Sequence, residues 1–462
     1  MTFSKEIEEK IDSYKDELLY HLTHLVEIPS VSSSKKEGMP FGVDSFRALS
    51  YVLKLAEDMG FDTYNCDGYA GHAEYGSGDE YVGVAVHVDV VPASEGWDSK
   101  PFTLTKKDGK IYGRGVSDDK GPAICALYAM KALRELGLTG DRRLRLIIGS
   151  GEETGMTDLS YYFKKEPYPT LGFSPDGDYP MANSESGILN ILGKFKGYDS
   201  VVKKFYGGLV YNAVPSYAFC IIDDRNVDID SLNEKAKTYQ NGECQIIAEM
   251  VRGELKLSST GRASHASVAE YGFNAVLNLM LFVADTYGER AGKAFLEIAD
   301  RFKTETDGKS LGIAMCDSIS KPLTLNIGKV IFEGGKGEAC IDIRYPVTAD
   351  GEAIVAQLKD ALKQLTLTVE ENLNPLYVEE DSELISKLRA VYEESTGKDG
   401  KPVSMAGGTY ARVMGPCAVA FGASFGDGSE GNIHMPNEFI TEESLIKNAK
   451  ICAKAMIALM QK

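Results

Sequence analysis

The chain has 462 residues, of which 43% are hydrophobic and 26% charged, so we expect two folded domains rather than one. A formal net charge of −18 argues against nucleic acid as a partner, because phosphate binding requires concentrated Lys and Arg. The N-terminal segment lacks the apolar core of an export signal, and no stretch of about 18 uncharged apolar residues occurs. We therefore expect a cytoplasmic protein without a membrane partner.

The first part of the chain alternates helices with short apolar strands. The predicted elements are, in order, helices over 4–28 and 43–59, a strand over 81–86, a helix over 121–136, and strands over 142–148 and 171–174. Apolar runs of this length are typical of parallel strands buried on both faces. Acidic or imidazole residues follow each of the three strands, at the sheet edge where open α/β folds bind ligands.

The pattern changes at about residue 184, and we interpret the next segment as an inserted α+β domain. Its predicted elements are strands at 188–195 and 255–259, a helix around 274–287, a strand at 338–345, a helix at 353–365 and a strand at 367–371. The first architecture resumes with a helix at 383–395, a strand at 418–421 and a helix at 442–460. The sequence thus predicts an α/β domain in two parts, 1–183 and 376–462, with a mostly parallel central sheet flanked by helices and an inserted domain at 184–375.

Two motifs place carboxylates beside a histidine or a helix start. His87 and Asp89 follow the first buried strand and project to the same side of an extended chain, so the carboxylate can orient an imidazole that binds metal. Asp118 and Asp119 directly precede a helix, where a helix cap is the simpler interpretation. A carboxylate at this position can also bridge two cations through its two oxygens.

The remaining motifs add three further candidate ligands. Glu152 and Glu153 follow the second strand, and adjacent carboxylates repel each other unless cations or protons neutralise them. One of them can bind metal while its neighbour moves a proton. Asp176 follows the third strand, and His434 lies near the far end of the chain. Each motif is weak evidence when taken alone, but their joint order predicts a metal site.

In these motifs the chain resembles the co-catalytic metallopeptidases, a family that includes aminoacylase, glutamate carboxypeptidase, succinyl-diaminopimelate desuccinylase and carnosinase. Residues 113–122 (GRGVSDDKGP) and 407–412 (GGTYAR) are most similar to the bacterial dipeptidase V group. The resemblance extends over nearly the whole chain. It implies a zinc-exopeptidase-like catalytic domain, with the inserted segment forming a lid.

The resemblance also implies two divalent metal ions per chain. The ligands it implies are His87, Asp118 and Asp176 for the first ion, and Asp118, Glu153 and His434 for the second. Asp118 would bridge the ions and precede a cis peptide bond. Glu152 would be the general base for a water between the metals, and Asp89 would orient His87. Carboxylate and imidazole ligands without thiolate suit zinc, our first expectation, and also manganese or cobalt.

The inserted segment carries three expected substrate contacts. His265, in the run 261–265 (GRASH), matches the histidine that hydrogen-bonds the scissile carbonyl oxygen and stabilises the oxyanion. Arg344 matches the arginine that binds the C-terminal carboxylate of the substrate. Asn212 is a further candidate for substrate binding. A lid of about 190 residues resembles the monomeric dipeptidase V arrangement, with a homodimer as the alternative.

The resemblance implies a dipeptidase that acts on short, unmodified peptides, which are the expected partners. Two alternatives stay open. An N-acyl amino acid deacylase, such as a desuccinylase, would use the same metals and a carboxylate-binding arginine. An inactive peptide-binding relative would keep the fold, but the loss of Glu152 or a ligand would then be expected, and all are present.

Overall fold

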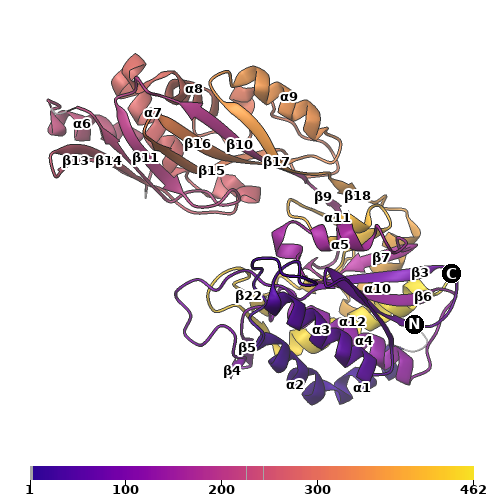
Figure 1. Cartoon of the computed structure of the whole chain (residues 1–462). Coiled ribbons are helices and arrows are strands. Elements are labelled where there is room, and N and C mark those ends of the chain that lie inside the picture. Colours follow the sequence, from indigo (N-terminus) through magenta and orange to yellow (C-terminus); the bar gives the residue numbers. More distant parts are fainter. Residues whose placement is uncertain (1–3, 225, 243) are drawn as a thin grey trace. The chain divides into compact units, whose positions relative to one another are not determined.

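The computed structural model describes residues 4–224, 226–242 and 244–462 (Figure 1). These residues form two compact units. Unit 1 comprises the chain up to Ser184 together with Leu376–Val403 and Gly408–Lys462, whereas unit 2 comprises Glu185–Pro375 and Ser404–Gly407. Among the described residues, none of the helices combines the length and the apolar character needed to cross a membrane.

Unit 1 is built around a mixed sheet with a parallel centre. Its four central strands are β6 (Arg143–Gly149), β3 (Tyr81–His87), β7 (Leu171–Ser174) and β20 (Ala418–Ala420), in that spatial order. The antiparallel strands β1 (Asp62–Cys66) and β2 (Ala70–Tyr75) extend it beyond β6, and β9 (Ala182–Glu185), β18 (Leu376–Tyr377) and β19 (Val403–Met405) extend it beyond β20. Every residue of β3 is buried, because helices cover both faces of the sheet.

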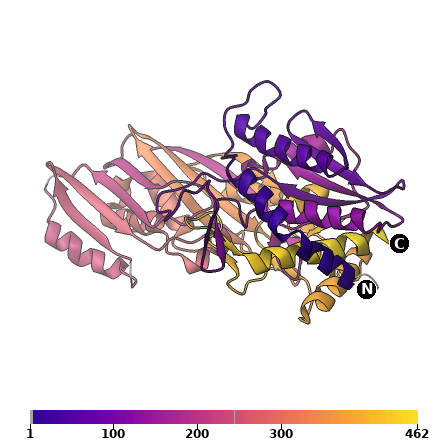
Figure 2. The ribbon, with the colours of Figure 1, turned by 90° about the horizontal axis from the view of Figure 1, so that it is seen from below.

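The helices of unit 1 form two layers. The bounds are α1 (Ser4–Ser13), α2 (Lys15–Val26), α3 (Val43–Asp58), α4 (Lys120–Glu135), α5 (Thr157–Tyr162), α10 (Glu383–Thr396), α11 (Tyr410–Met414) and α12 (Glu442–Met460). Helices α3, α4 and α12 cover one face of the sheet, and α5 and α11 cover the other (Figure 1). Figure 2 shows the indigo N-terminal helices beside the yellow helix α12, where Lys450 pairs with Asp12 at 2.7 Å.

A small antiparallel sheet in unit 1 joins two distant parts of the sequence. Its strands are β4 (Thr105–Lys107), β5 (Lys110–Tyr112), β23 (Phe439–Thr441) and β22 (Glu430–Gly431). Tyr112 is the register partner of Phe439. The chain that follows β5 leads to Asp118, and the chain between β22 and β23 contains His434. A second small pair, β8 (Gly177–Asp178) and β21 (Ala423–Ser424), lies just after Asp176.

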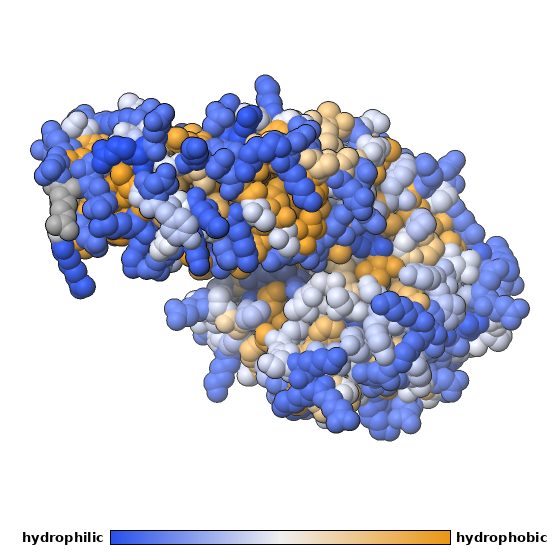
Figure 3. All heavy atoms as spheres, turned by 45° about the horizontal axis from the view of Figure 1, so that its top comes forward, coloured by the Kyte–Doolittle hydropathy of each residue, from blue (hydrophilic) through white to orange (hydrophobic). Residues whose placement is uncertain are grey.

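Unit 2 is an eight-stranded antiparallel sheet with helices on one face. In spatial order its strands are β13 (Ile246–Val251), β14 (Glu254–Thr260), β12 (Tyr217–Ile222), β11 (Val202–Gly208), β15 (Thr324–Glu333), β16 (Lys336–Tyr345), β10 (Gly187–Lys196) and β17 (Thr366–Leu373). Its α-helices are α6 (Ile229–Ala236), α7 (Ala275–Tyr287), α8 (Lys293–Phe302) and α9 (Gly351–Ala361). Alternate residues of β12, such as Ala218 and Cys220, are buried in the core that the sheet forms with the helices, whereas Tyr217 is exposed. Figure 3 shows apolar residues at the surface of this unit among mostly hydrophilic ones.

The architecture of both units agrees with the predicted fold class, and the two largest differences in element boundaries concern helices. The helix predicted over 4–28 is two helices, α1 and α2, separated by a turn at Tyr14, whose ψ of −1° interrupts the helical geometry. The helix predicted over 353–365 ends at Ala361, because Leu362 has a ψ of 83°. Apolar periodicity continues past both points, so it could not reveal where the backbone leaves the helix.

Candidate active site

The C-terminal ends of three neighbouring parallel strands bring the candidate catalytic side chains of unit 1 together. His87 is the last residue of β3, Glu152 and Glu153 follow β6, and Asp176 follows β7. Asp118 lies directly before α4, which begins at Lys120. The polar groups lie at the edge where the connections leave the sheet, as the open α/β architecture favours.

Asp118 lies between the two histidines. Its Oδ1 is 3.0 Å from Nε2 of His87, and its Oδ2 is 3.0 Å from Nε2 of His434. His434 Nε2 is also 3.0 Å from Oε1 of Glu153, and His87 Nε2 is 3.7 Å from Oδ2 of Asp176. The two oxygens of Asp118 therefore face two different imidazole groups, which is the placement that a bridging carboxylate requires.

Two groups of potential metal ligands overlap at His87. The ligand atoms of His87, Glu152 and Asp176 all lie within 4.8 Å of one another, and those of His87, Asp118 and Glu153 do as well. Glu152, which the resemblance implies as the general base, thus lies in one group with two of the implied ligands, His87 and Asp176. The peptide bond between Asp118 and Asp119 is cis, as the resemblance implied.

The electrostatics of this cluster favour added positive charge. Burial raises the pKa of Glu152 and Asp176, and nearby carboxylates add to the increase despite the opposing effect of His87. Burial lowers the pKa of His434, but hydrogen bonds to Asp118 and Glu153 more than offset this effect and raise it to about 11. The Oδ1 atom of Asp119 is buried without a hydrogen-bond partner. This set of oxygen and nitrogen donors fits divalent cations, which would neutralise the crowded carboxylates.

Asp89 connects His87 with the two glutamates. Its buried carboxylate accepts hydrogen bonds from the backbone N–H groups of Glu152 at 3.2 Å and Glu153 at 3.1 Å. Nδ1 of His87 is 3.1 Å from the backbone oxygen of Asp89 and 3.5 Å from its Oδ1. With an acceptor on its Nδ1 side, the ring turns Nε2 toward Asp118, as in histidines that bind metal through this nitrogen. Asp89 therefore contacts the His87 ring mainly through its backbone oxygen, while its carboxylate holds the loop of the two glutamates.

The structure also reveals supporting residues that the sequence did not identify. Asp158, on α5, is fully buried and accepts hydrogen bonds from the N–H groups of Ser150 and Gly151, each at 2.8 Å, and from the hydroxyl of Tyr410. The Tyr410 ring contacts the His87 ring edge-on, with centroids 6.1 Å apart. Tyr410 lies in the run 407–412 that carried the resemblance, and this was the only available signal. Asp158 has none.

The three other predicted site residues belong to unit 2. Asn212 and His265 lie on neighbouring loops, since the N–H of Ala266 donates to the backbone oxygen of Asn212 at 2.9 Å. Asn326 fixes this region by donating from Nδ2 to the backbone oxygen of Tyr211 at 3.1 Å. These contacts hold the two loops in a defined arrangement within the unit.

Arg344 on β16 is held by a bidentate ion pair. Its Nε and Nη2 donate to the two carboxylate oxygens of Asp342, both at 2.8 Å, and the Arg344 side chain is only 7% exposed. Asp342 and Arg344 are two residues apart on one strand, so they project from the same face of the sheet. The guanidinium plane is therefore fixed by Asp342 before any substrate contact.

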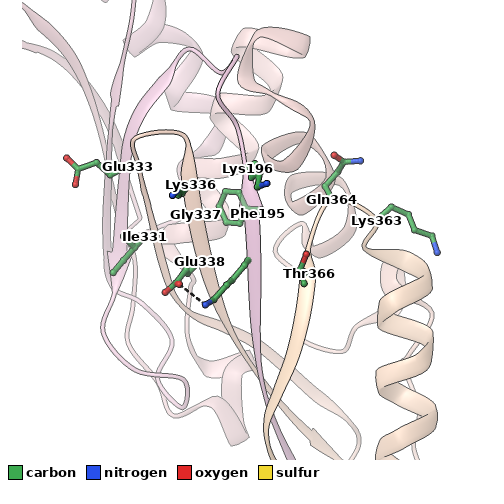
Figure 4. Close-up of a pocket in the computed structure, with 11 residues that line it drawn as sticks. Phe195, Lys196, Ile331, Glu333, Lys336, Gly337, Glu338, Lys363, Gln364 and Thr366 are labelled. Carbon is green, nitrogen blue, oxygen red and sulfur yellow. Dashed lines mark ion pairs between the residues drawn. The ribbon is translucent and has the colours of Figure 1, made fainter.

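A hollow of about 700 Å³ in unit 2 is lined by none of the predicted site residues. It lies where β10 and β15 end and β16 begins, and its lining includes the charged side chains of Lys196, Lys336 and Glu333 (Figure 4). Among the lining residues, Lys194 of β10 pairs at 3.6 Å with Glu338, its register partner on the neighbouring strand β16. We assign it no part in the reaction.

Comparisons with known proteins agree with the motifs. The sequence model of Peptidase family M20/M25/M40 matches residues 83–458. A Bacillus subtilis (strain 168) protein named "Putative dipeptidase YtjP" is 37% identical over 458 residues, which cover 96% of this chain and 97% of that protein. The di-peptidase Dug1p of Saccharomyces cerevisiae has a TM-score of 0.63 at 15% identity, covering 99% of this chain and 98% of that one. Human carnosine dipeptidase 1 has a TM-score of 0.61 at 17% identity, covering 99% of both chains.

Similarity to solved structures and similarity of sequence support different conclusions. At 15% and 17% identity the solved structures show the shared fold. The family match covers most of the chain, and the B. subtilis relative is similar along nearly its whole length. The chain therefore belongs to peptidase family M20/M25/M40 and is a hydrolase that acts on peptide bonds.

Proposed function

We propose that this protein is a metal-dependent dipeptidase that cleaves unmodified dipeptides and acts in the cytoplasm. The observation that carries the proposal is the position of Asp118, with one oxygen 3.0 Å from each of the two histidines and with Glu152 and Glu153 beside it. The dipeptidase names of the similar proteins support the choice of substrate. A monomer is the state we favour, with a homodimer as the alternative.

In this proposal two divalent ions occupy the cluster, with zinc as the first candidate and manganese or cobalt as the others. The proposed ligands are His87, Asp118 and Asp176 for one ion, and Asp118, Glu153 and His434 for the other. When bound, such ions acidify water and polarise the amide carbonyl. The protein itself contributes the fixed positions of the ligands, which Asp89 secures on the side of His87.

Glu152 is the proposed general base and acid. Its carboxylate belongs to the same cluster as His87 and Asp176, with ligand atoms within 4.8 Å of one another, so it is placed to exchange a proton with a water held there. Glu152 would take a proton from the attacking water and deliver it to the departing amine nitrogen. Its backbone N–H is fixed by Asp89, so the start of its side chain is held in place.

The proposed substrate contacts come from unit 2, which would act as a lid. His265 would donate a hydrogen bond to the developing oxyanion. Arg344 would bind the C-terminal carboxylate of the substrate, since a guanidinium whose plane is fixed by Asp342 loses little freedom on binding. Asn212, on the loop beside His265, would add a polar contact. A carboxylate bound in this way limits the length of the peptide.

The activity is tested with metal-stripped protein reloaded with zinc or manganese, and with a panel of dipeptides, tripeptides and N-acetyl or N-succinyl amino acids. Metal-dependent cleavage confined to dipeptides supports the proposal. Turnover of the acylated amino acids alone would identify a deacylase instead. Metal binding without any turnover would identify an inactive binding protein.

The role of Glu152 is tested separately, because it lies within ligand distance of His87 and Asp176. Glu152→Gln keeps the size of the side chain but cannot hold the transferred proton. If Glu152 is the general base, we expect Glu152→Gln to lower kcat by about 100-fold or more while both ions stay bound. Loss of an ion in this variant would show that Glu152 is a ligand.

The role of Arg344 is tested with Arg344→Lys, which keeps the charge but removes the planar fork. We expect KM for dipeptides to rise by about 10-fold to 100-fold, which is the effect of losing a charge-assisted hydrogen bond. Dipeptide amides, which lack the carboxylate, are the matched control. Their KM should be the same in both proteins, and an equal rise for dipeptides and amides would exclude carboxylate binding by Arg344.

A further inference from the structure

A buried carboxylate connects the loop of Asp118 with the loop of His434. Glu438 is 0% exposed and lies four residues after His434. Its Oε2 accepts hydrogen bonds from Nη1 of Arg114 at 2.8 Å and from the N–H of Gly115 at 3.0 Å. Its Oε1 accepts from the N–H groups of Ser117 at 2.9 Å and Asp118 at 3.2 Å. One side chain thus binds the loop that ends at Asp118.

Further hydrogen bonds to the main chain connect the same two loops around Glu438. The N–H of Gly113 donates to the backbone oxygen of Glu438 at 3.1 Å, and the hydroxyl of Ser117 donates to that of Phe439 at 2.8 Å. Strands β5 and β23 pair directly beside them. These contacts align the two loops along the small sheet, but among the described residues only Glu438 accepts a hydrogen bond from the N–H of Asp118 itself.

The chemistry of these contacts requires a carboxylate at position 438. All four partners of its two oxygens are donors, and an ionised carboxylate only accepts. Glutamine would direct its NH₂ group at two N–H donors and leave those donors unsatisfied in the interior. Arg114 is 1% exposed, and Nη1 pairs only with Glu438 among the described residues, so its charge also depends on this carboxylate.

We propose that Glu438 is a positioning residue that fixes the separation between Asp118 and His434 and thereby sets the affinity for the ion that these two residues share. The inference rests on the metal site proposed above. Glu438 touches neither substrate nor ion. It acts through the main chain of Asp118 on one side and through the short segment leading back to His434 on the other.

The experiment measures metal binding directly. Chelator-treated wild type, Glu438→Gln and Glu74→Gln are titrated with manganese or zinc by calorimetry, and their folds are compared by circular dichroism. Glu74→Gln is the matched control, because Glu74 also accepts hydrogen bonds from a buried arginine of unit 1, Arg145 at 2.8 Å, but contacts neither loop. This variant shows how the loss of a comparable ion pair elsewhere in unit 1 changes the fold and the metal affinity.

We expect Glu438→Gln to bind one ion like the wild type and the second about 10-fold to 100-fold more weakly, as is typical when a residue that orients a ligand is changed. Its kcat should fall at low metal and recover with excess metal, while KM stays constant. Glu74→Gln should bind both ions like the wild type. Wild-type affinity for both ions in a folded Glu438→Gln would overturn the proposal.

Two further outcomes can be distinguished from a failure of the positioning role: a variant that does not fold, and a wild type that binds no pair of ions. If Glu438→Gln does not fold, Glu438→Asp takes its place, because the shorter carboxylate keeps the charge but cannot reach all four donors. Wild-type affinity for both ions in that variant refutes the positioning role. If the wild type itself binds no pair of ions, the result contradicts the proposed metal site. That outcome differs from a failure of the positioning role, in which the wild type binds two ions and the variant binds them equally well.

Discussion

His72 should make unit 1 lose stability in mild acid. It lies on β2, is 8% exposed, and its Nδ1 is 2.7 Å from the hydroxyl of Tyr162. Burial, with a further contribution from Arg145, lowers the pKa of His72 from 6.5 to about 4. The folded protein therefore keeps this imidazole neutral at pH values at which the unfolded chain is already protonated.

The sign and the size of the effect follow from this difference. Between the two pKa values the unfolded state binds more protons than the folded state. The contribution of neutral His72 to the free energy of unfolding is therefore complete above its unfolded pKa, and it is lost as the pH falls toward its folded pKa. The loss is about 3 kcal/mol below pH ~4, and about 2 kcal/mol between pH ~7 and pH ~4.5. Other groups titrate in the same range, so the contribution of His72 must be isolated by a variant.

The matched variant is His72→Asn, whose amide oxygen can take the place of Nδ1 beside Tyr162 but does not titrate. Urea unfolding with chelator present is followed at about pH 7 and about pH 4.5. The fluorescence of Trp97, the only tryptophan in the chain, reports on unit 1. Asparagine should destabilise unit 1 at both pH values, but the wild type should lose about 2 kcal/mol more than the variant on acidification. Equal losses in the two proteins would refute the argument.

Three other predictions concern the active site. Gly149→Ala should lower kcat and destabilise unit 1 by about 1–3 kcal/mol, because the added Cβ would lie 1.8 Å from the Tyr410 hydroxyl; unchanged urea midpoints and rates would contradict this. Removing metal with a chelator should lower the thermal midpoint of unit 1, by an amount equivalent to about 3 kcal/mol relative to protein in metal at 100 times Kd; an unchanged midpoint would argue against tight binding. His265→Ala should lower kcat about 100-fold while leaving metal titrations unchanged, and altered metal affinity would show a different role.

Most of the central architecture of unit 1 could be predicted from local sequence. The strand predicted at 171–174 and the helix predicted at 442–460 have the bounds observed for β7 and α12. Strands buried on both faces and long amphipathic helices carry strong local patterns, because their surroundings are uniformly apolar or change with a regular period. Strands such as β1, β4 and β5 were not predicted, since they are short or exposed and carry little apolar signal.

The candidate ligands could also be proposed from sequence, because chemistry restricts them to carboxylate and imidazole groups in recognisable runs at strand ends. The supporting residues could not. Glu438 bonds to Asp118, which lies 320 positions earlier, and Asp158 bonds to Tyr410, which lies 252 positions later.

The sequence by itself therefore determined the central elements of the fold, the family resemblance and the chemical types of the candidate site residues. Only the tertiary structure decided that Asp118 faces both histidines, that Asp342 holds Arg344, and that Glu438 binds the loop of Asp118. The physical reason is that a hydrogen bond depends on distance and direction in space. A carboxylate near a site has the same sequence signal as one on the surface until folding brings its donors to it.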